Sequence, residues 1–305
     1  MPPTVAPRIE VISTLSSFET FSVLFDNYGP LYIDLGGKDL GRHGTISIVS
    51  VFSPSANTVW LFDVETLGSA AFTQPDALGF TLKEILQSSS RTKYFWDIRN
   101  DADALWAIYN VNLSGVIDVQ LLENASRAGN KRYLSGLAKA IQYDANLGFV
   151  ERERWLRVKR DITDMMRHDV FSQRPLEEQT IQYCANDVVH LPRLVTCYKQ
   201  RIKRGWLSKA LVESEKRVVE AHSPSYNPQS PTKVLGPWAE DIDLWPSSVE
   251  NDPGEDGPAM FEFSSIGFYD DGGGDDTGGY ESDFPNAHDG AFCSEALYSC
   301  WDNSL

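Results

Sequence analysis

RPLEEQTIQYCAND, residues 174–187, is the stretch that decides how this chain is interpreted. Apolar residues from Leu176 onward recur at a spacing that favours an amphipathic helix, and Pro175 is expected in its first turn. Tyr183 and Asp187 are four residues apart, so their side chains face the same way on such a helix. A phenol and a carboxylate held one turn apart are a candidate catalytic pair.

Two further acids accompany segments that are expected to be buried strands. The run LYIDLGG, residues 31–37, places Asp34 at the end of a strand, and KYFWDIRND, residues 93–101, ends in Asp101. Carboxylate oxygens are the natural ligands of hard divalent cations. Three acids from distant segments, Asp34, Asp101 and Asp187, can therefore share one metal site if the fold brings them together.

Short apolar runs alternate with helical patterns along the first 220 residues, which indicates an α/β fold with a mixed central sheet flanked by helices. Strands are expected over residues 9–12, 31–35, 45–52, 58–64, 92–96 and 116–118. Helices are expected over residues 81–86, capped by Thr81, over 101–109, from 131 onward, and over 198–220 as a final basic helix.

The charge of the 305 residues is unevenly placed. Residues 221–305 hold 17 of the 43 acids and only Lys233 of the 27 basic residues, whereas residues 1–220 carry 26 of each. We expect one domain at 1–220 and a largely disordered acidic tail at 221–305. The tail is interpreted as a solubilising segment, a competitor for a basic surface, or a binding site for a protein partner.

The four cysteines form no Cys-x-x-Cys or Cys/His cluster, which argues against a zinc site or a disulfide framework and favours a reducing, intracellular setting. No stretch approaches about 18 consecutive apolar residues. We therefore expect neither secretion nor a membrane span.

These motifs resemble those of the DEDDy 3′-5′ exonucleases, the ribonuclease D, Werner exonuclease and Egalitarian-like group, over roughly residues 5 to 205. The first motif of that family is Asp-x-Glu, which corresponds here to Asp34-Leu35-Gly36. The second surrounds Asp101, and the run VIDVQ at 116–120 resembles the family's Asp-x-Gln strand end. The third is Tyr183-x-x-x-Asp187. The resemblance implies a ribonuclease H-like fold.

The resemblance also implies a site. Its metal ligands would be Asp34, Asp101 and Asp187, holding two Mg²⁺ or Mn²⁺ ions, and Tyr183 would orient the attacking water. The substrate would be the 3′ end of single-stranded nucleic acid, with RNA favoured over DNA. Arg42, Arg99 and Asn100 are candidates to bind the substrate, although a solvated turn explains Arg42 equally well and an ion pair with Asp97 or Asp103 is the commoner role for Arg99.

Gly36 stands where the family has its glutamate, so one metal ligand is missing. Residues i and i+2 of a strand face the same way, and Asp-x-Glu would aim both carboxylates at one site. Loss of a residue that merely supports a metal ligand typically costs about 10 to 100-fold in metal affinity or activity, and loss of a ligand at least as much. Two hypotheses remain open: a weakened 3′-5′ exonuclease, and an inactive pseudo-exonuclease that acts as an RNA-binding protein or a protein adaptor.

Several other residues have two interpretations. Asp39 and Asp63-Val64-Glu65 could replace the missing carboxylate, but a plain turn or strand end is favoured for both. His190 is interpreted as a structural histidine in preference to a site residue. Basic residues that suit either phosphate contacts or a solvated helix face are Arg152, Arg154, Arg157, Lys159 and Arg160, and Lys199, Arg201, Lys203, Arg204 and Lys209.

Overall fold

The computed structural model describes residues 6–22, 29–165 and 169–238. The acidic stretch 239–305, which forms most of the predicted tail, lies outside the described residues. Within the described part, no helix is long and apolar enough to cross a membrane.

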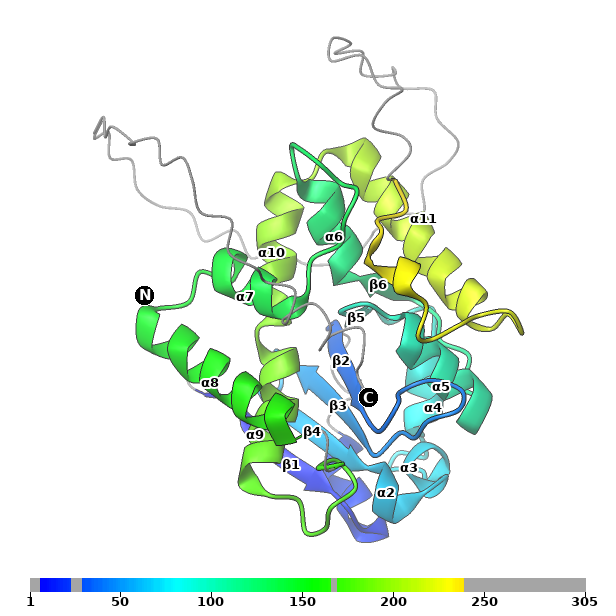
Figure 1. The fold of residues 1–305 in the computed structure, drawn as a ribbon. Helices are drawn as coiled ribbons and strands as arrows, with labels where there is room; N and C mark the ends of the chain where they lie inside the picture. Colours follow the sequence, from blue (N-terminus) through cyan, green and yellow to red (C-terminus); the bar gives the residue numbers. More distant parts are fainter. Residues whose placement is uncertain (1–5, 23–28, 166–168, 239–305) are drawn as a thin grey trace.

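A six-stranded mixed sheet forms the centre of the fold (Figure 1), as the sequence predicts. Its spatial order is β1-β4-β3-β2-β5-β6. The strands β2, β3 and β4 form an antiparallel meander, whereas β1 pairs with β4, β5 with β2, and β6 with β5 in parallel. The strands are β1 (Arg8–Ile12), β2 (Leu31–Gly36), β3 (Ile48–Ser53), β4 (Thr58–Asp63), β5 (Lys93–Phe95) and β6 (Val116–Asp118).

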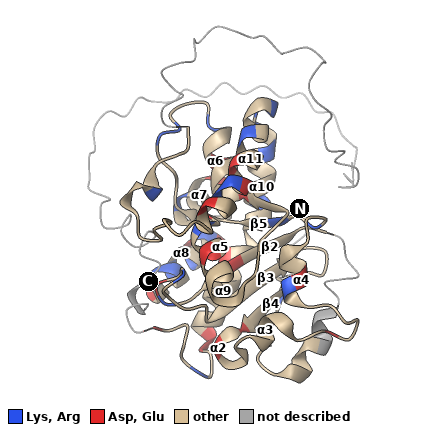
Figure 2. Cartoon of the chain, turned by 90° about the vertical axis from the view of Figure 1, so that its right-hand side faces the viewer, with Lys and Arg blue, Asp and Glu red and all other residues tan. Residues whose placement is uncertain are grey.

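Helices lie on both faces of the sheet, and Figure 2 shows the same arrangement from the side. The smaller helical elements are η1 (Leu15–Ser22), α2 (Val64–Leu67), α3 (Ala70–Thr73), α4 (Leu82–Gln87), α6 (Val119–Ser126), α7 (Leu137–Asp144) and η3 (Pro231–Val234). The longer ones are α5 (Arg99–Tyr109), α8 (Phe149–Met165), α9 (Glu178–Val189), α10 (Leu191–Arg201) and α11 (Arg204–Ala221).

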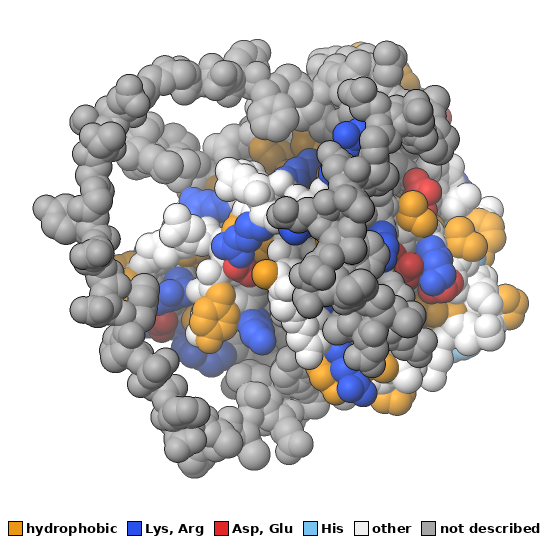
Figure 3. All heavy atoms as spheres, turned by 90° about the horizontal axis from the view of Figure 1, so that it is seen from above, with side chains coloured by type: hydrophobic (Ala, Val, Ile, Leu, Met, Phe, Trp, Pro, Cys, Tyr) orange, Lys and Arg blue, Asp and Glu red, His pale blue; other side chains and the backbone are white. Residues whose placement is uncertain are grey.

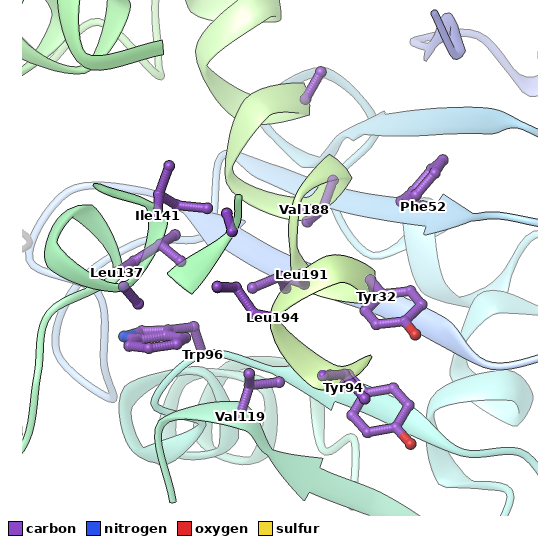
Figure 4. Close-up of a cluster of buried hydrophobic side chains, with 14 of the residues drawn as sticks. Tyr32, Phe52, Tyr94, Trp96, Val119, Leu137, Ile141, Val188, Leu191 and Leu194 are labelled. Carbon is purple, nitrogen blue, oxygen red and sulfur yellow. The ribbon is translucent and has the colours of Figure 1, made fainter. Parts of the chain in front are cut away.

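The sheet separates two apolar cores. Alternate residues of β2 point to opposite faces, so Ile33 and Leu35 enter the core beside α4 and α5, whereas Tyr32 enters the core beneath α9 and α10. Figure 4 shows this second core, where Tyr32 stacks on Tyr94 with ring centroids 5.0 Å apart. Asp34 shares the face of Tyr32, so the strand period directs it towards α9.

Three sequence predictions about helix limits need correction, and a fourth is confirmed. The helix expected from residue 131 begins only at Leu137, as α7. Pro175 is not in the first turn of α9, because the helix begins at Glu178. The predicted helix 198–220 is two helices, since α10 ends at Arg201 and α11 begins at Arg204. The cap of α4 is as expected: Thr81 accepts from the backbone N–H of Glu84, and the Glu84 carboxylate accepts from the backbone N–H of Thr81.

Residues 222–238, which we call the C-terminal strap, pack onto the folded domain although the sequence analysis assigned them to the tail. Leu235 forms an antiparallel bridge with Tyr133, and the backbone N–H of Gly236 donates to the carbonyl of Arg132 at 2.7 Å. The strap ends at the buried Trp238, whose ring meets Trp206 edge-on at 5.4 Å. The folded domain therefore extends past α11.

A buried ion pair joins α11 to the ends of β5 and β6. Asp118 is fully buried and accepts hydrogen bonds from the backbone N–H groups of Asp97 and Ile98. Asp118 also accepts from the backbone N–H of Gln120 and pairs with Arg217, whose Nη1 lies 2.5 Å from Asp118 Oδ2. Removing one partner of a buried pair leaves an uncompensated charge in a poorly solvated place, which is strongly destabilising.

We expect Arg217→Met to lower the free energy of unfolding by about 3–5 kcal/mol. The matched control is Lys216→Met on the same helix, where the lysine is 56% exposed and pairs with Glu213 and Glu220. Exposed pairs contribute about 0–1 kcal/mol. Urea unfolding followed by circular dichroism measures both, and equal losses would contradict the structural role of the Asp118–Arg217 pair.

Candidate functional site

Asp34 lies on β2 opposite Ser50 of β3 and keeps partial exposure. Loss of hydration and the negative charge of Asp187 raise the pKa of Asp34 to about 7, while the positive charge of Lys159 acts in the opposite direction. These influences require short distances, so the chain does bring Asp34 and Asp187 into one neighbourhood.

Asp101 joins the same neighbourhood from α5. The helix begins directly after β5, at Arg99, and therefore holds Asp101 in its first turn. Burial and the charges of Asp34 and Asp97 hold the pKa of Asp101 well above its usual range. The Oδ1 atom of Asp101 is buried and has no hydrogen-bond partner among the described residues. A raised pKa and an unpartnered oxygen mark this carboxyl group as unusual.

Tyr183 and Asp187 are one turn apart on α9 and both are buried, at 7% and 5% exposure. Burial, followed by the charges of Asp187 and Asp34, holds the pKa of the Tyr183 phenol well above its usual range. The Oδ1 atom of Asp187 is buried without a hydrogen-bond partner in the described part of the chain. The Oδ2 atom of Asp187, by contrast, has a close hydrogen-bond partner.

That partner is Lys159 of α8. Its Nζ lies 2.7 Å from Asp187 Oδ2 and 2.6 Å from the Tyr183 hydroxyl, and 4.2 Å from the centroid of the Tyr183 ring. Lys159 is only 8% exposed. A buried ammonium needs a compensating negative charge. The acid cluster of Asp34, Asp101 and Asp187 therefore contains a cation supplied by the protein itself.

Sequence reasoning missed this role, because Lys159 was grouped with the solvated basic residues of its helix. The sequence did carry a sign that Lys159 lies on the buried face of α8. Trp155, Lys159 and Ile162 stand at i, i+4 and i+7, the spacing of one helix face, and all three are buried. Arg157 and Arg160 of the same helix are exposed.

The space beside Gly36 is filled by an aromatic ring. A Cβ atom added to Gly36 would lie 3.2 Å from both Cδ1 and Cε1 of Phe171. Phe171 is buried and packs on Tyr183 with ring centroids 5.9 Å apart. A glutamate at position 36 would thus require Phe171 to move, so the missing carboxylate has been replaced by apolar packing.

The sequence profile of the 3′-5′ exonuclease family matches residues 9–202. This chain belongs to that family. The match covers every element from β1 to α10, and the mixed sheet flanked by helices agrees with the ribonuclease H-like exonuclease fold. Members of this family generally use divalent metals.

Solved structures with the same fold include three from Trypanosoma brucei. RNase D in complex with RNA U12 has a TM-score of 0.59 and 22% identity and covers 71% of each chain. The RNase D–GMP complex has a TM-score of 0.61 and 21% identity, covering 75% of this chain and 69% of the other. The catalytic core of RRP6 has a TM-score of 0.52 and 13% identity, with coverage of 76% and 59%.

At these identities the likeness establishes the fold alone. No curated protein sequence is similar enough to the chain to count as a match.

The donor set does not fit the two-metal site of the family in this arrangement. Lys159 occupies one oxygen of Asp187, and Gly36 offers no carboxylate. Among the described residues there is no group of three or more His, Cys, Asp or Glu side chains placed to hold a metal ion. The unpartnered oxygens of Asp101 and Asp187 alone do not complete a site for two hard cations.

The three residues predicted to bind substrate are all engaged by α11 or the C-terminal strap. Arg42 donates to Asp103 and to the backbone carbonyls of residues 221, 223 and 224. Arg99 pairs with Asp97 and donates to the carbonyl of Lys233.

Asn100 Oδ1 accepts from the Tyr226 hydroxyl and from Lys233 Nζ, both at 2.8 Å. The charge of Asp101 raises the pKa of Tyr226, after the larger effects of burial and Asp97, so the strap passes beside the acid cluster.

Among the described residues, no contact joins Asp39 or Asp63 to the cluster of Asp34, Asp101 and Asp187. Asp63 caps α2 and forms an ion pair with Arg174, whose Nε lies 2.7 Å from Asp63 Oδ2, which agrees with the strand-end interpretation. Asp39 lies in the turn after β2 at a left-handed backbone position with φ of 49°. His190 is buried, and burial lowers its pKa to about 4.

We expect Asp34→Asn to stabilise the protein by up to about 4 kcal/mol above pH 7. Because the pKa of Asp34 is raised in the folded state, the unfolded chain ionises first, and folding is penalised progressively from about pH 4 to pH 7. The advantage of the variant should therefore disappear as the pH falls towards 4.

Chemical denaturation of wild type and variant across this pH range measures the difference. Asp39→Asn is the control, since Asn tolerates the left-handed backbone position at residue 39. A pH-independent effect at position 34 would rule out the raised pKa as its cause.

Proposed function

We propose that this chain binds the 3′ end of single-stranded RNA, in preference to DNA, and holds it with little or no hydrolysis. The observation that carries the proposal is the bond between Lys159 and the Asp187–Tyr183 pair. Membership of the 3′-5′ exonuclease family supports nucleic acid as the ligand. The RNase D structures of the same fold are complexes with RNA U12 and with GMP, which supports RNA.

The physical argument concerns charge. Two metals would bring four positive charges to a cluster in which Asp187 already contacts an ammonium and Asp34 feels its charge. A metal at Asp187 would either displace Lys159 from Oδ2 or share the carboxylate with it, and in both cases the nearby ammonium would repel the metal. The loss of a ligand at Gly36 weakens metal binding further. Phosphates of a bound strand can instead be neutralised by exposed arginines of α8, such as Arg157 and Arg160.

A second candidate is a weak two-metal exonuclease. It is favoured by the retention of Asp34, Asp101, Tyr183 and Asp187 in one cluster, and by the buried, unpartnered oxygens of Asp101 and Asp187. The two candidates differ in whether RNA is shortened, and an assay of turnover separates them.

We expect wild-type protein to bind 5′-labelled single-stranded RNA without shortening it in Mn²⁺. Gel electrophoresis of the labelled strand reports turnover, and fluorescence anisotropy reports binding. The control is Asp187→Ala, in which any genuine activity should vanish. A ladder of shortened products made by wild type and lost in Asp187→Ala would favour the weak exonuclease, and absence of RNA binding would defeat both candidates.

We also expect Lys159→Met to create metal binding that wild type lacks. Methionine has a similar length and no charge, so the variant frees Asp187 while leaving α8 packed. Mn²⁺ should raise the melting temperature of the variant in a concentration-dependent way and leave wild type unchanged. Arg157→Met, on the exposed side of the same helix, is the control. A shift of similar size in wild type would contradict the competition between Lys159 and metal.

A further inference from the structure

A second feature of the molecule lies near the end of the described chain, away from the acid cluster. Residues 191–212, which form α10 and the start of α11, contain six lysines and arginines and no aspartate or glutamate. Lys203, Arg204 and Lys209 are exposed at the junction of the two helices, around Trp206. We call these four residues the Trp206 surface. Figure 3, seen from above, shows Lys and Arg side chains at several places on this side of the molecule, among apolar and acidic ones.

The Trp206 ring is the centre of this surface. Lys209 Nζ lies 4.7 Å from its centroid, and Lys131 Nζ approaches it to 4.8 Å. Trp238, the last described residue, packs edge-on against the same ring. The described chain therefore ends at a strongly cationic part of the domain, and residue 239 begins there.

The segment from residue 239 to the end of the chain is strongly anionic. Residues 239–305 carry seventeen aspartates and glutamates and no lysine or arginine, whereas residues 1–238 carry 26 acids and 27 basic residues. The first three acids are Glu240, Asp241 and Asp243. An extended chain advances at most about 3.6 Å per residue, so these acids lie within roughly 20 Å of Trp238 and can reach Lys203 and Lys209.

We propose that the acidic segment 239–305 docks on the Trp206 surface of its own chain and competes there with single-stranded nucleic acid. We choose this segment as the occupant because its negative charge complements the cations of the Trp206 surface, and because the described chain ends at Trp238, beside that surface. Tethering raises its effective concentration to the millimolar range, so weak individual contacts suffice.

The competition rests on the proposed RNA binding. Single strands are bound by cations that follow the phosphates together with aromatic rings that stack on the bases. The Trp206 surface supplies the cations, and the segment offers their counterpart, since its carboxylates alternate with aromatic residues such as Trp245, Phe261 and Phe263. Both ligands therefore need the same cations, and the attraction of each is screened by salt.

The docking is tested directly by zero-length carbodiimide crosslinking of the full-length monomer. Crosslinks should join Lys203 or Lys209 to acids of residues 239–305 and disappear in high salt. Lys38 and Lys83, which lie on other parts of the domain, provide the internal comparison. Crosslinks at Lys203 and Lys209 no more frequent than at Lys38 and Lys83 would overturn the docking.

The competition is tested by a double-mutant cycle on the full-length chain, with fluorescent oligouridylate as the probe. One change converts the seventeen acids of residues 239–305 to their amides. The other is Lys203→Gln/Arg204→Gln/Lys209→Gln. We expect the amide change to tighten oligouridylate binding about tenfold at low salt, to lose this effect at high salt, and to have no effect when the three cations are absent.

The outcomes separate the two proposals. Specific crosslinks without oligouridylate binding would uphold the docking and defeat the proposed function together with the competition. Oligouridylate binding that the amide change leaves unaltered would uphold the proposed function and overturn the competition. An equal gain with and without the three cations would also overturn it, because the segment would then act through general charge repulsion.

Discussion

The contact of Lys159 with Asp187 and Tyr183 is the constraint on which the rest of the site depends. Three carboxyl groups drawn to one end of a sheet repel one another, as the raised pKa values of Asp34 and Asp101 record. An exonuclease of this fold resolves that repulsion with metal ions. Here a lysine of α8 provides positive charge at the same cluster, and its covalent attachment makes it present at all times.

The surroundings of the cluster are consistent with that arrangement. Phe171 closes the space beside Gly36 with apolar packing, and the strap engages Asn100 through Tyr226 and Lys233. These contacts fill the space beside Gly36 and occupy Asn100 Oδ1 with partners from the same chain. The scaffold that positions the acids is nevertheless intact, because β2, α5 and α9 keep the places that the fold requires.

The sheet and the meeting of the three acids could be predicted because they follow from local patterns: strand runs, a helix start, and a four-residue spacing in α9. Lys159 could not be singled out from its basic neighbours without knowing which face of α8 meets α9, although Trp155 and Ile162 carried that information. The strap was assigned to the tail because its Pro/Ser-rich composition resembles a linker. Its position on the domain comes from distant partners such as Arg42 and Trp206, which no local pattern encodes.

The packing of Phe171 against Gly36 also bears on how this family member can change over evolutionary time. A lone mutation that restores glutamate at position 36 meets an aromatic ring at 3.2 Å and gains no free Asp187, because Lys159 still holds it. Such a change needs Phe171 to yield by a few tenths of an ångström and leaves the Lys159 contact in place. A complete first motif beside an accessible Asp187 therefore requires changes at more than one position.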